Sequence, residues 1–173
     1  TRDIQADAIV VATGSSWPNL PQFPIDGQQL LTSQHLLDLN CIPASLLIVG
    51  AGVEGCEFAA LYSGLGTEVT IVELMARVLP LEDEDISSTM EREVKKRGVT
   101  VLTGTTVERL ERSPATIVAH LKDGTQVVAE KMLVSVGRGF NSQGIGLEQV
   151  GVQTGRRGEI LVNERMETTV PGI

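Results

Sequence analysis

Residues 46–55 read LLIVGAGVEG, and residues 56–61 continue as CEFAAL. The apolar run predicts a buried strand and the following residues a helix, so a G-x-G-x-x-G pattern falls where a strand turns into a helix. There, the first glycine permits a tight turn, the second lets a pyrophosphate approach the backbone, and the third lets the helix pack closely on the strand. Free N–H groups at the helix start would point at the anion. The stretch predicts a dinucleotide-binding turn made of Gly50, Ala51, Gly52, Val53, Glu54 and Gly55.

A second motif supplies the acidic residue that such a turn needs. The run GTEVTIVE over residues 66–73 ends in Glu73, which follows Gly50 by 23 residues. A carboxylate at the end of a second strand can accept hydrogen bonds from the 2′- and 3′-hydroxyls of an adenosine ribose. It would repel a 2′-phosphate, which favours NAD(H) over NADP(H). The alternative interpretation is a glycine turn in an ordinary α/β domain.

Length and composition fit a soluble domain. The chain has 173 residues, of which 42% are hydrophobic and 21% charged, and its formal net charge is −8. The negative charge argues against a nucleic-acid-binding surface. The sequence shows no apolar run of about 18 residues and no signal peptide, so we expect a cytoplasmic protein without a membrane partner. The cysteines and histidines form no metal-ligand or catalytic pattern, so we expect no metal and only packing or surface roles for Cys41, Cys56, His35 and His120.

The remaining pattern predicts an α/β fold, with a Rossmann-like parallel sheet, helices on its faces and a small antiparallel β-meander. We expect helices over 32–39, 52–65 and 85–97, and sheet strands over 6–12, 46–49, 66–73, 99–102 and 131–136. The middle helix should bury Phe58, Leu61, Tyr62 and Leu65, and Asp85 or Ser87 should cap the last helix. The meander should comprise 107–112, 116–121 and 126–129, and the proline-rich segment 17–27 should be a linker.

Several ordered motifs resemble those of the pyridine-nucleotide disulfide oxidoreductase family, and within it most closely the branch of dihydrolipoamide dehydrogenases. They are ATGS at 12–15, LIVGAGV at 47–53 with Glu57, VTIVE at 69–73, VGR at 136–138 and TTVPGI at 168–173. The resemblance spans essentially the whole chain. It implies an NAD(H)-binding domain over 41–140, a flanking piece of the flavin domain with a linker over 1–40, and a return segment toward the flavin domain over 141–173.

The resemblance also assigns residues to the nucleotide. It implies that Glu57 helps to hold the nicotinamide carboxamide, that Gly137 lies beside the nicotinamide end and that Val107 lines the adenine pocket. Val107 could equally be a strand residue only, and Gly137 a turn only. Glu54 departs from the isoleucine or valine usual in the family. Its carboxylate would repel a diphosphate within several ångströms by about 1–4 kcal/mol, whereas a side chain that points to solvent would matter little. We therefore expect Glu54→Ile to tighten NADH binding.

The same resemblance implies that the chain is a fragment. Thr13, Gly14 and Ser15 match a loop that contacts FAD, whereas the family's flavin glycine motif and its C-x-x-x-x-C redox disulfide would precede Thr1. A flavin-contacting aspartate and a dimerisation domain with a catalytic His-Glu pair would follow Ile173. We therefore expect no catalytic residue in this chain, and a homodimer for the full-length protein.

Three functions fit these residues. The first is the NAD(H)-binding domain of a flavin-dependent disulfide oxidoreductase, which in the intact enzyme transfers hydride between NAD and FAD. The second is the same domain of a relative with another acceptor, such as an NADH oxidase or a mercuric reductase. The third is a non-catalytic module that binds NAD(H).

Overall fold

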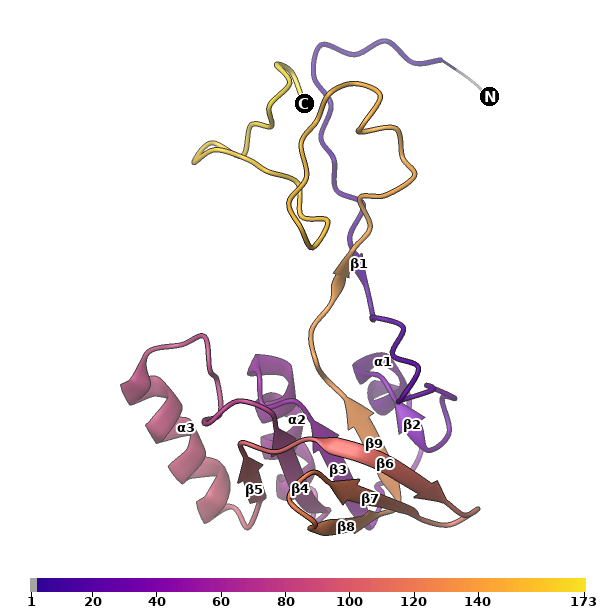
Figure 1. The fold of residues 1–173 in the computed structure, drawn as a ribbon, viewed down its shortest axis with the longest axis vertical. Coiled ribbons are helices and arrows are strands. Elements are labelled where there is room, and N and C mark those ends of the chain that lie inside the picture. Colours follow the sequence, from indigo (N-terminus) through magenta and orange to yellow (C-terminus); the bar gives the residue numbers. More distant parts are fainter. Residues whose placement is uncertain (1–2) are drawn as a thin grey trace. The chain divides into compact units, whose positions relative to one another are not determined.

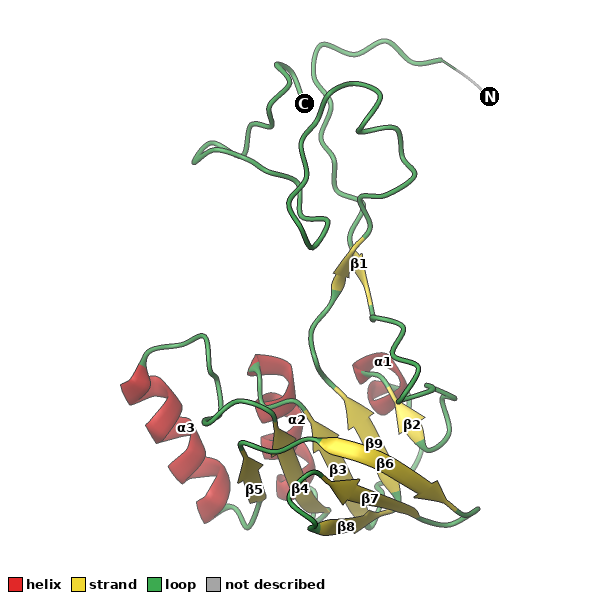
Figure 2. Cartoon of the chain, viewed as in Figure 1, coloured by secondary structure: helices red, strands yellow, loops and turns green. Residues whose placement is uncertain are grey.

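The structure is a computed structural model that describes residues 3–173, and the chain divides into two compact units (Figure 1). Unit 1 combines Thr1–Pro18 with Arg138–Ile173, and unit 2 is the continuous segment Asn19–Gly137. Unit 2 carries the helices and most of the strands, whereas unit 1 consists mainly of loops (Figure 2). The two units are described separately.

A parallel sheet forms the centre of unit 2, as predicted, and it has five strands. Its strand order is β2 (Leu30–Leu31), β9 (Lys131–Val134), β3 (Ser45–Val49), β4 (Glu68–Glu73) and β5 (Thr100–Thr103). The register pairs Leu46 of β3 with Val69 on one side and with Lys131 on the other. From β3 the chain adds β4 and then β5 on one side, while β9 lies on the other side. The strand order thus reverses beside β3, and open α/β sheets bind ligands outside the carboxyl ends of the strands at such a point.

Alternate side chains of β3 point to opposite faces of the sheet and enter two separate cores. Leu46 and Ile48 pack on the side covered by helices α1 (Ser33–Leu37), α2 (Val53–Gly64) and α3 (Glu84–Lys96). Leu47 and Val49 pack on the side covered by an antiparallel sheet of β6 (Val107–Arg112), β7 (Ile117–Leu121) and β8 (Gln126–Ala129). Unit 2 therefore has three layers, with the helices on one face of the parallel sheet and the predicted meander on the other.

The middle helix, α2, begins and ends close to the predicted residues, but its buried face differs. Gly52 is its N-cap, and Gly66 follows its end with a φ of +92°. Leu61 and Leu65 were predicted to be buried, and this is wrong because they are 48% and 49% exposed. Small side chains allow α2 to lie close to the sheet, so the buried set is Gly55, Cys56, Phe58, Ala59 and Tyr62.

The start of α3 also differs from the prediction. Its N-cap is Asp83, not Asp85 or Ser87. Ser87 is buried, and its hydroxyl donates a hydrogen bond to the carbonyl oxygen of Val78 at 2.6 Å. The hydroxyl therefore anchors the preceding loop instead of capping the helix. Among residues 3–173, no helix has both the length and the apolar character needed to cross a bilayer.

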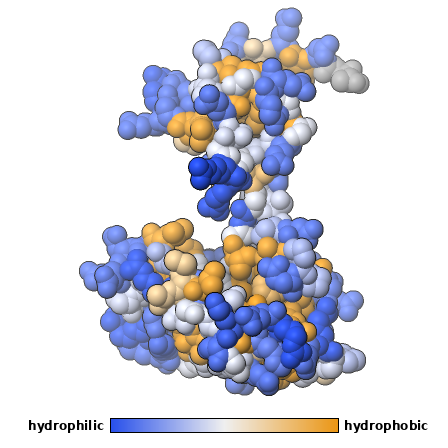
Figure 3. All heavy atoms as spheres, in the orientation of Figure 1, coloured by the Kyte–Doolittle hydropathy of each residue, from blue (hydrophilic) through white to orange (hydrophobic). Residues whose placement is uncertain are grey.

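Unit 1 contains little regular structure. Its strands β1 (Ser15–Ser16) and β10 (Gly139–Phe140) pair in antiparallel fashion, and Thr154 bridges Ile160. The predicted strand over 6–12 is wrong, because none of the described residues forms a strand ladder with this segment. The N–H of Ile9 donates to the carbonyl oxygen of Gly172 at 2.8 Å. Apolar side chains remain on the surface of this unit (Figure 3).

Candidate nucleotide-binding site

The glycine-rich turn connects the end of β3 with the start of α2. Gly50 has a φ of +104°, and a Cβ at this position would lie 2.1 Å from the carbonyl oxygen of Ser135. A Cβ on Gly55 would lie 2.0 Å from the carbonyl oxygen of Gly50. Around Gly52, by contrast, no described atom lies within 4 Å of an added Cβ. Packing within the protein thus requires Gly50 and Gly55, whereas the open space at Gly52 suits the close approach of a pyrophosphate.

Glu73 connects the end of β4 to this turn. Its side chain is buried, and its Oε2 accepts a hydrogen bond from the N–H of Ala51 at 2.6 Å. Its Oε1 accepts another from the N–H of Met75 at 2.7 Å. Each carboxylate oxygen has two lone pairs, so capacity remains for the hydroxyls of a ligand. The structure therefore brings together the two motifs that the sequence analysis combined.

Leu79 is a contributor to the turn that the sequence analysis missed. It is buried, its φ of +45° is rare for a residue other than glycine, and its N–H donates to the carbonyl oxygen of Ala51 at 2.8 Å. Glu73 accepts a hydrogen bond from the N–H of Ala51, so both the N–H and the carbonyl oxygen of Ala51 are fixed. The arrangement sets the direction of the amides that follow. No pattern in the sequence signals a positive φ at a leucine.

Ser135 is a second residue that the sequence analysis missed. Its Oγ donates a hydrogen bond to Oε2 of Glu54 at 2.8 Å, and its N–H donates to the carbonyl oxygen of Val49 at 2.8 Å. The strand β9 ends at Val134, two residues earlier than predicted, so Ser135 lies at the carboxyl end of the strand. That end is where ligands of parallel sheets bind, so a polar residue closing an apolar strand was the available signal.

The other residues assigned to the nucleotide lie at several places in unit 2. Val53 and Glu57 are exposed on the first turns of α2, and Gly137 is exposed with a φ of +102°. Gly137 follows Ser135 by two residues and is therefore close to the turn in the chain. Val107 begins β6 and is buried in the core on the meander side of the sheet.

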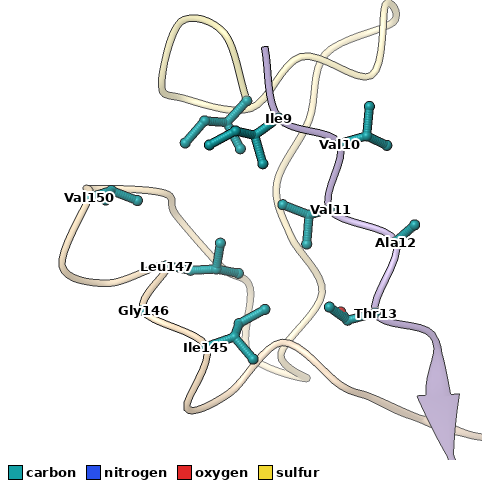
Figure 4. Close-up of a pocket in the computed structure, with 10 residues that line it drawn as sticks. Ile9, Val10, Val11, Ala12, Thr13, Ile145, Gly146, Leu147 and Val150 are labelled. Carbon is teal, nitrogen blue, oxygen red and sulfur yellow. The ribbon is translucent and has the colours of Figure 1, made fainter. Parts of the chain in front are cut away.

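Thr13, Gly14 and Ser15 belong to unit 1. Thr13 lines an apolar pocket (Figure 4), together with Ile9, Val10, Val11, Ala12, Ile145, Gly146, Leu147, Val150 and Ile173. Gly14 has a φ of +74°, and its carbonyl oxygen accepts a hydrogen bond from the N–H of Asn141 at 3.1 Å. The Oγ of Ser15 accepts a hydrogen bond from Nε of Arg138 at 2.6 Å. The loop is thus braced by the second segment of the same unit.

Charge and burial make Cys56 an unreactive neighbour of the turn. Burial, followed by the negative charges of Glu73 and Glu57, raises the pKa of the Cys56 thiol to about 11. The thiol is therefore protonated at neutral pH, and the thiolate is the reactive form. Within the part of the chain that the structure describes, no group of three or more His, Cys, Asp or Glu residues is arranged to hold a metal ion.

Known proteins are similar to this chain in both sequence and fold. The sequence model described as pyridine nucleotide-disulphide oxidoreductase matches residues 1–173. A dihydrolipoyl dehydrogenase of Bacillus subtilis is 41% identical over 172 residues, which cover 98% of this chain and 37% of that protein. A protein named NAD(P)H dehydrogenase (quinone), from Mycobacterium tuberculosis, is 36% identical over 100% of this chain and 35% of its own length.

Solved structures give the same result. LpdA from Mycobacterium tuberculosis superposes with a TM-score of 0.87 at 36% identity, covering 96% of this chain and 36% of that one. The HOCl-induced flavoprotein disulfide reductase RclA from Escherichia coli has a TM-score of 0.84 at 28% identity, covering 98% and 39%. The chain therefore spans little more than a third of the length of these relatives.

Proposed function

Because the chain belongs to the pyridine nucleotide-disulphide oxidoreductase family, we propose that unit 2 is the NAD(H)-binding domain of a flavoprotein similar to the dihydrolipoyl dehydrogenases. In this proposal the whole protein, a homodimer, transfers hydride between NAD(H) and FAD while a dithiol is oxidised. The chain described here contributes nucleotide binding. The hydride chemistry itself belongs to the bound cofactors.

The amides at the start of α2 hold the pyrophosphate in this proposal, with the open space at Gly52 as the point of approach. Glu73 holds the adenosine ribose beside β4, and the segment that begins at Val107 borders the adenine. Gly137 and Glu57 lie on the nicotinamide side. Gly137 and Glu57 are exposed, which is compatible with contact to a ligand. The side chain of Val107 is buried, so its contact with the nucleotide should be the smallest of the three.

Unit 1 contributes to the FAD site in the same proposal. The turn at Thr13 and Gly14 is exposed, and Thr13 borders the apolar pocket of this unit. An exposed glycine with positive φ lets a ligand approach the backbone, and an apolar lining suits an aromatic ring system. FAD, when bound, accepts or supplies the hydride. The residues Thr13, Gly14 and Ser15 would position one part of it.

The observation that carries the proposal is the hydrogen bond between Glu73 and the N–H of Ala51. It joins the acidic residue at the end of β4 to the glycine turn at the end of β3. Dinucleotide sites of this type use both groups on one ligand, the amides for pyrophosphate and the carboxylate for ribose. An ordinary glycine turn has no need of a buried carboxylate beside it.

Replacing Glu73 by glutamine tests the proposal. The amide keeps the shape and one of the two oxygens that accept from the N–H groups of Ala51 and Met75, but it loses the charge and the second acceptor. NADH should therefore bind about tenfold more weakly. Discrimination against NADPH should fall by a similar factor, because the repulsion of a 2′-phosphate is removed. Calorimetric titration of both nucleotides measures the two effects. Glu68→Gln, at the exposed opposite end of β4, is the matched control. Unchanged discrimination in Glu73→Gln would contradict the assignment.

A different electron acceptor is the second candidate, and the name NAD(P)H dehydrogenase (quinone) of a 36% identical relative favours it. The acceptor site lies outside the residues assigned here to the nucleotide. Assays of the full-length protein with NADH and either lipoamide or a quinone distinguish the two. If the protein turns over with the quinone and not with lipoamide, the substrate in the first proposal is a quinone and not a dithiol.

A further inference from the structure

Glu54 reaches from the helix after β3 to the end of the neighbouring strand β9. Its Oε2 accepts the hydroxyl hydrogen of Ser135 at 2.8 Å, across 81 residues of chain. Ser135 is itself held by its N–H bond to the carbonyl oxygen of Val49 at 2.8 Å. The side chain of Glu54 therefore has a defined direction, toward β9, in the half-buried space at the carboxyl ends of β3 and β9.

Glu73 and Glu54 lie on opposite sides of the glycine turn. Glu73 closes β4, and Ser135 follows β9, while β3 runs between these strands. A dinucleotide with its adenosine ribose at Glu73 and its pyrophosphate at the turn must extend its second nucleoside toward β9. Glu54 points to that side. The carboxylate that departs from the family pattern thus faces the nicotinamide half of the site.

The charge of a nicotinamide ring depends on its oxidation state. The oxidised ring carries one positive charge and the reduced ring carries none, so a carboxylate nearby attracts only the oxidised form. Glu57, one turn further along α2, adds a second negative charge on this helix. The basic side chains that follow β4 and β9 along the chain are engaged elsewhere. Arg77 donates to the carbonyl oxygen of Glu82 at 2.9 Å, and Arg138 donates to Oγ of Ser15 at 2.6 Å.

We propose that Glu54, oriented by Ser135, is a specificity-determining residue that makes this site prefer oxidised NAD⁺ to NADH. The inference rests on the proposed function, because it takes the pyrophosphate and ribose positions from it. The same carboxylate weakens the binding of any diphosphate, whatever the state of the ring. Its removal should therefore tighten NADH while weakening the preference for NAD⁺.

Three ligands separate these effects in calorimetric titrations: NAD⁺, NADH and ADP-ribose, which lacks nicotinamide. Glu54→Gln keeps an oxygen that can accept the Ser135 hydrogen bond and removes only the charge. We expect the ratio of the Kd of NAD⁺ to that of NADH to rise about tenfold in this variant. ADP-ribose should follow NADH. Glu84→Gln, in the first turn of α3, is the matched control and should leave the ratio unchanged.

The outcomes distinguish the inference from its premise. If ADP-ribose binds the unmodified protein and the ratio is the same in Glu54→Gln, the inference about Glu54 is wrong while the proposed function stands. If ADP-ribose does not bind, both are wrong. Should Glu54→Gln fail to fold, the unmodified protein still gives a test. A preference for NAD⁺ that is based on charge must become weaker as the ionic strength rises, so the ratio of the Kd of NAD⁺ to that of NADH must increase. A ratio independent of salt would overturn it.

Discussion

Unit 2 buries two large apolar clusters on the faces of a parallel sheet, whereas in the described part of unit 1 only Leu147 and Val152 are buried apolar residues. In unit 2, Leu47 and Leu133 have no exposed surface, while in unit 1 Ile4 is 83% and Val10 88% exposed. Full burial of such a side chain stabilises a fold by about 1.5–3 kcal/mol. The difference teaches that the glycine turn stands on a scaffold that supplies its own stability, which is what accurate placement of backbone amides requires.

The largest expected effect is at Gly50. In Gly50→Ala the new Cβ would clash with the carbonyl oxygen of Ser135 and the backbone would be strained at positive φ, so we expect unit 2 to lose about 4 kcal/mol or more. Denaturant unfolding measures this loss. Gly52→Ala is the control, because its Cβ enters open space; it should keep the stability and weaken NADH binding. Equal stability losses in both variants would refute the division between packing and ligand glycines.

The next effect concerns the core of unit 2 against the surface of unit 1. Leu133→Ala empties a fully buried position in the interior strand β9 and should cost about 3 kcal/mol. Val10→Ala in unit 1 should change the free energy of unfolding by less than about 0.5 kcal/mol. Thermal and denaturant unfolding of both variants give the comparison. A larger loss in the free energy of unfolding of Val10→Ala would show that this exposed side chain of unit 1 contributes to stability.

A smaller effect comes from Asp26, on the surface of unit 2. Burial alone would raise its pKa, but hydrogen bonds from the N–H groups of Gln28, Gln29 and Leu30, together with Arg112, lower it from 3.8 to about 2. A lowered pKa in the folded state means that the stabilisation is present above pH 3.8 and is lost as the pH falls through 2.

The variant Asp26→Asn should therefore cost about 1–2 kcal/mol at neutral pH and flatten the loss of stability below pH 4. Unfolding curves at several pH values measure both consequences. Arg112→Gln removes only one of the contributions and should give an intermediate result. If Asp26→Asn loses stability below pH 4 as steeply as the unmodified protein, other carboxylates cause that loss.

The smallest effect leaves stability unchanged and probes the core directly. Cys41 is exposed and Cys56 is buried with a pKa raised to about 11, so a thiol reagent should label Cys41 quickly and Cys56 only when unit 2 opens. Mass spectrometry of the labelled chain gives both rates. Labelling of Cys56 as fast as that of Cys41 would show that the helix layer opens without global unfolding.

The central part of unit 2 could be predicted from the sequence because its residues obey simple patterns. The apolar run before Gly50, the β-branched run before Glu73 and the glycine after α2 set element type and order by local physics. These elements were sufficient to predict a parallel sheet, and the structure confirms it. The neighbouring strand β2 was missed, because its two leucines follow a proline-rich segment and gain their strand pairing only from β9.

The errors come from long-range packing. Leu61 and Leu65 fit a helical stripe, but which stripe faces the sheet depends on where small residues allow close approach. The segment 6–12 has the composition of a strand, yet a strand exists only where a ladder partner is present. In the site, the polar position after an apolar strand could have signalled Ser135, but no local pattern encodes its bond to Glu54 or the bond of Leu79 to Ala51.

The position of strand β9 in the sheet has a consequence for how the protein is made. It is inserted between β2 and β3, so Leu30 pairs with Met132 and Val49 with Val134, although most of unit 2 is synthesised between them. Loop closure over such separations is slow, and the emerging chain exposes the unpaired edges of β2 and β3 until β9 has been made. The side of the site formed by Ser135 therefore appears only after β9 has been made, and β9 is the last of the five sheet strands along the chain.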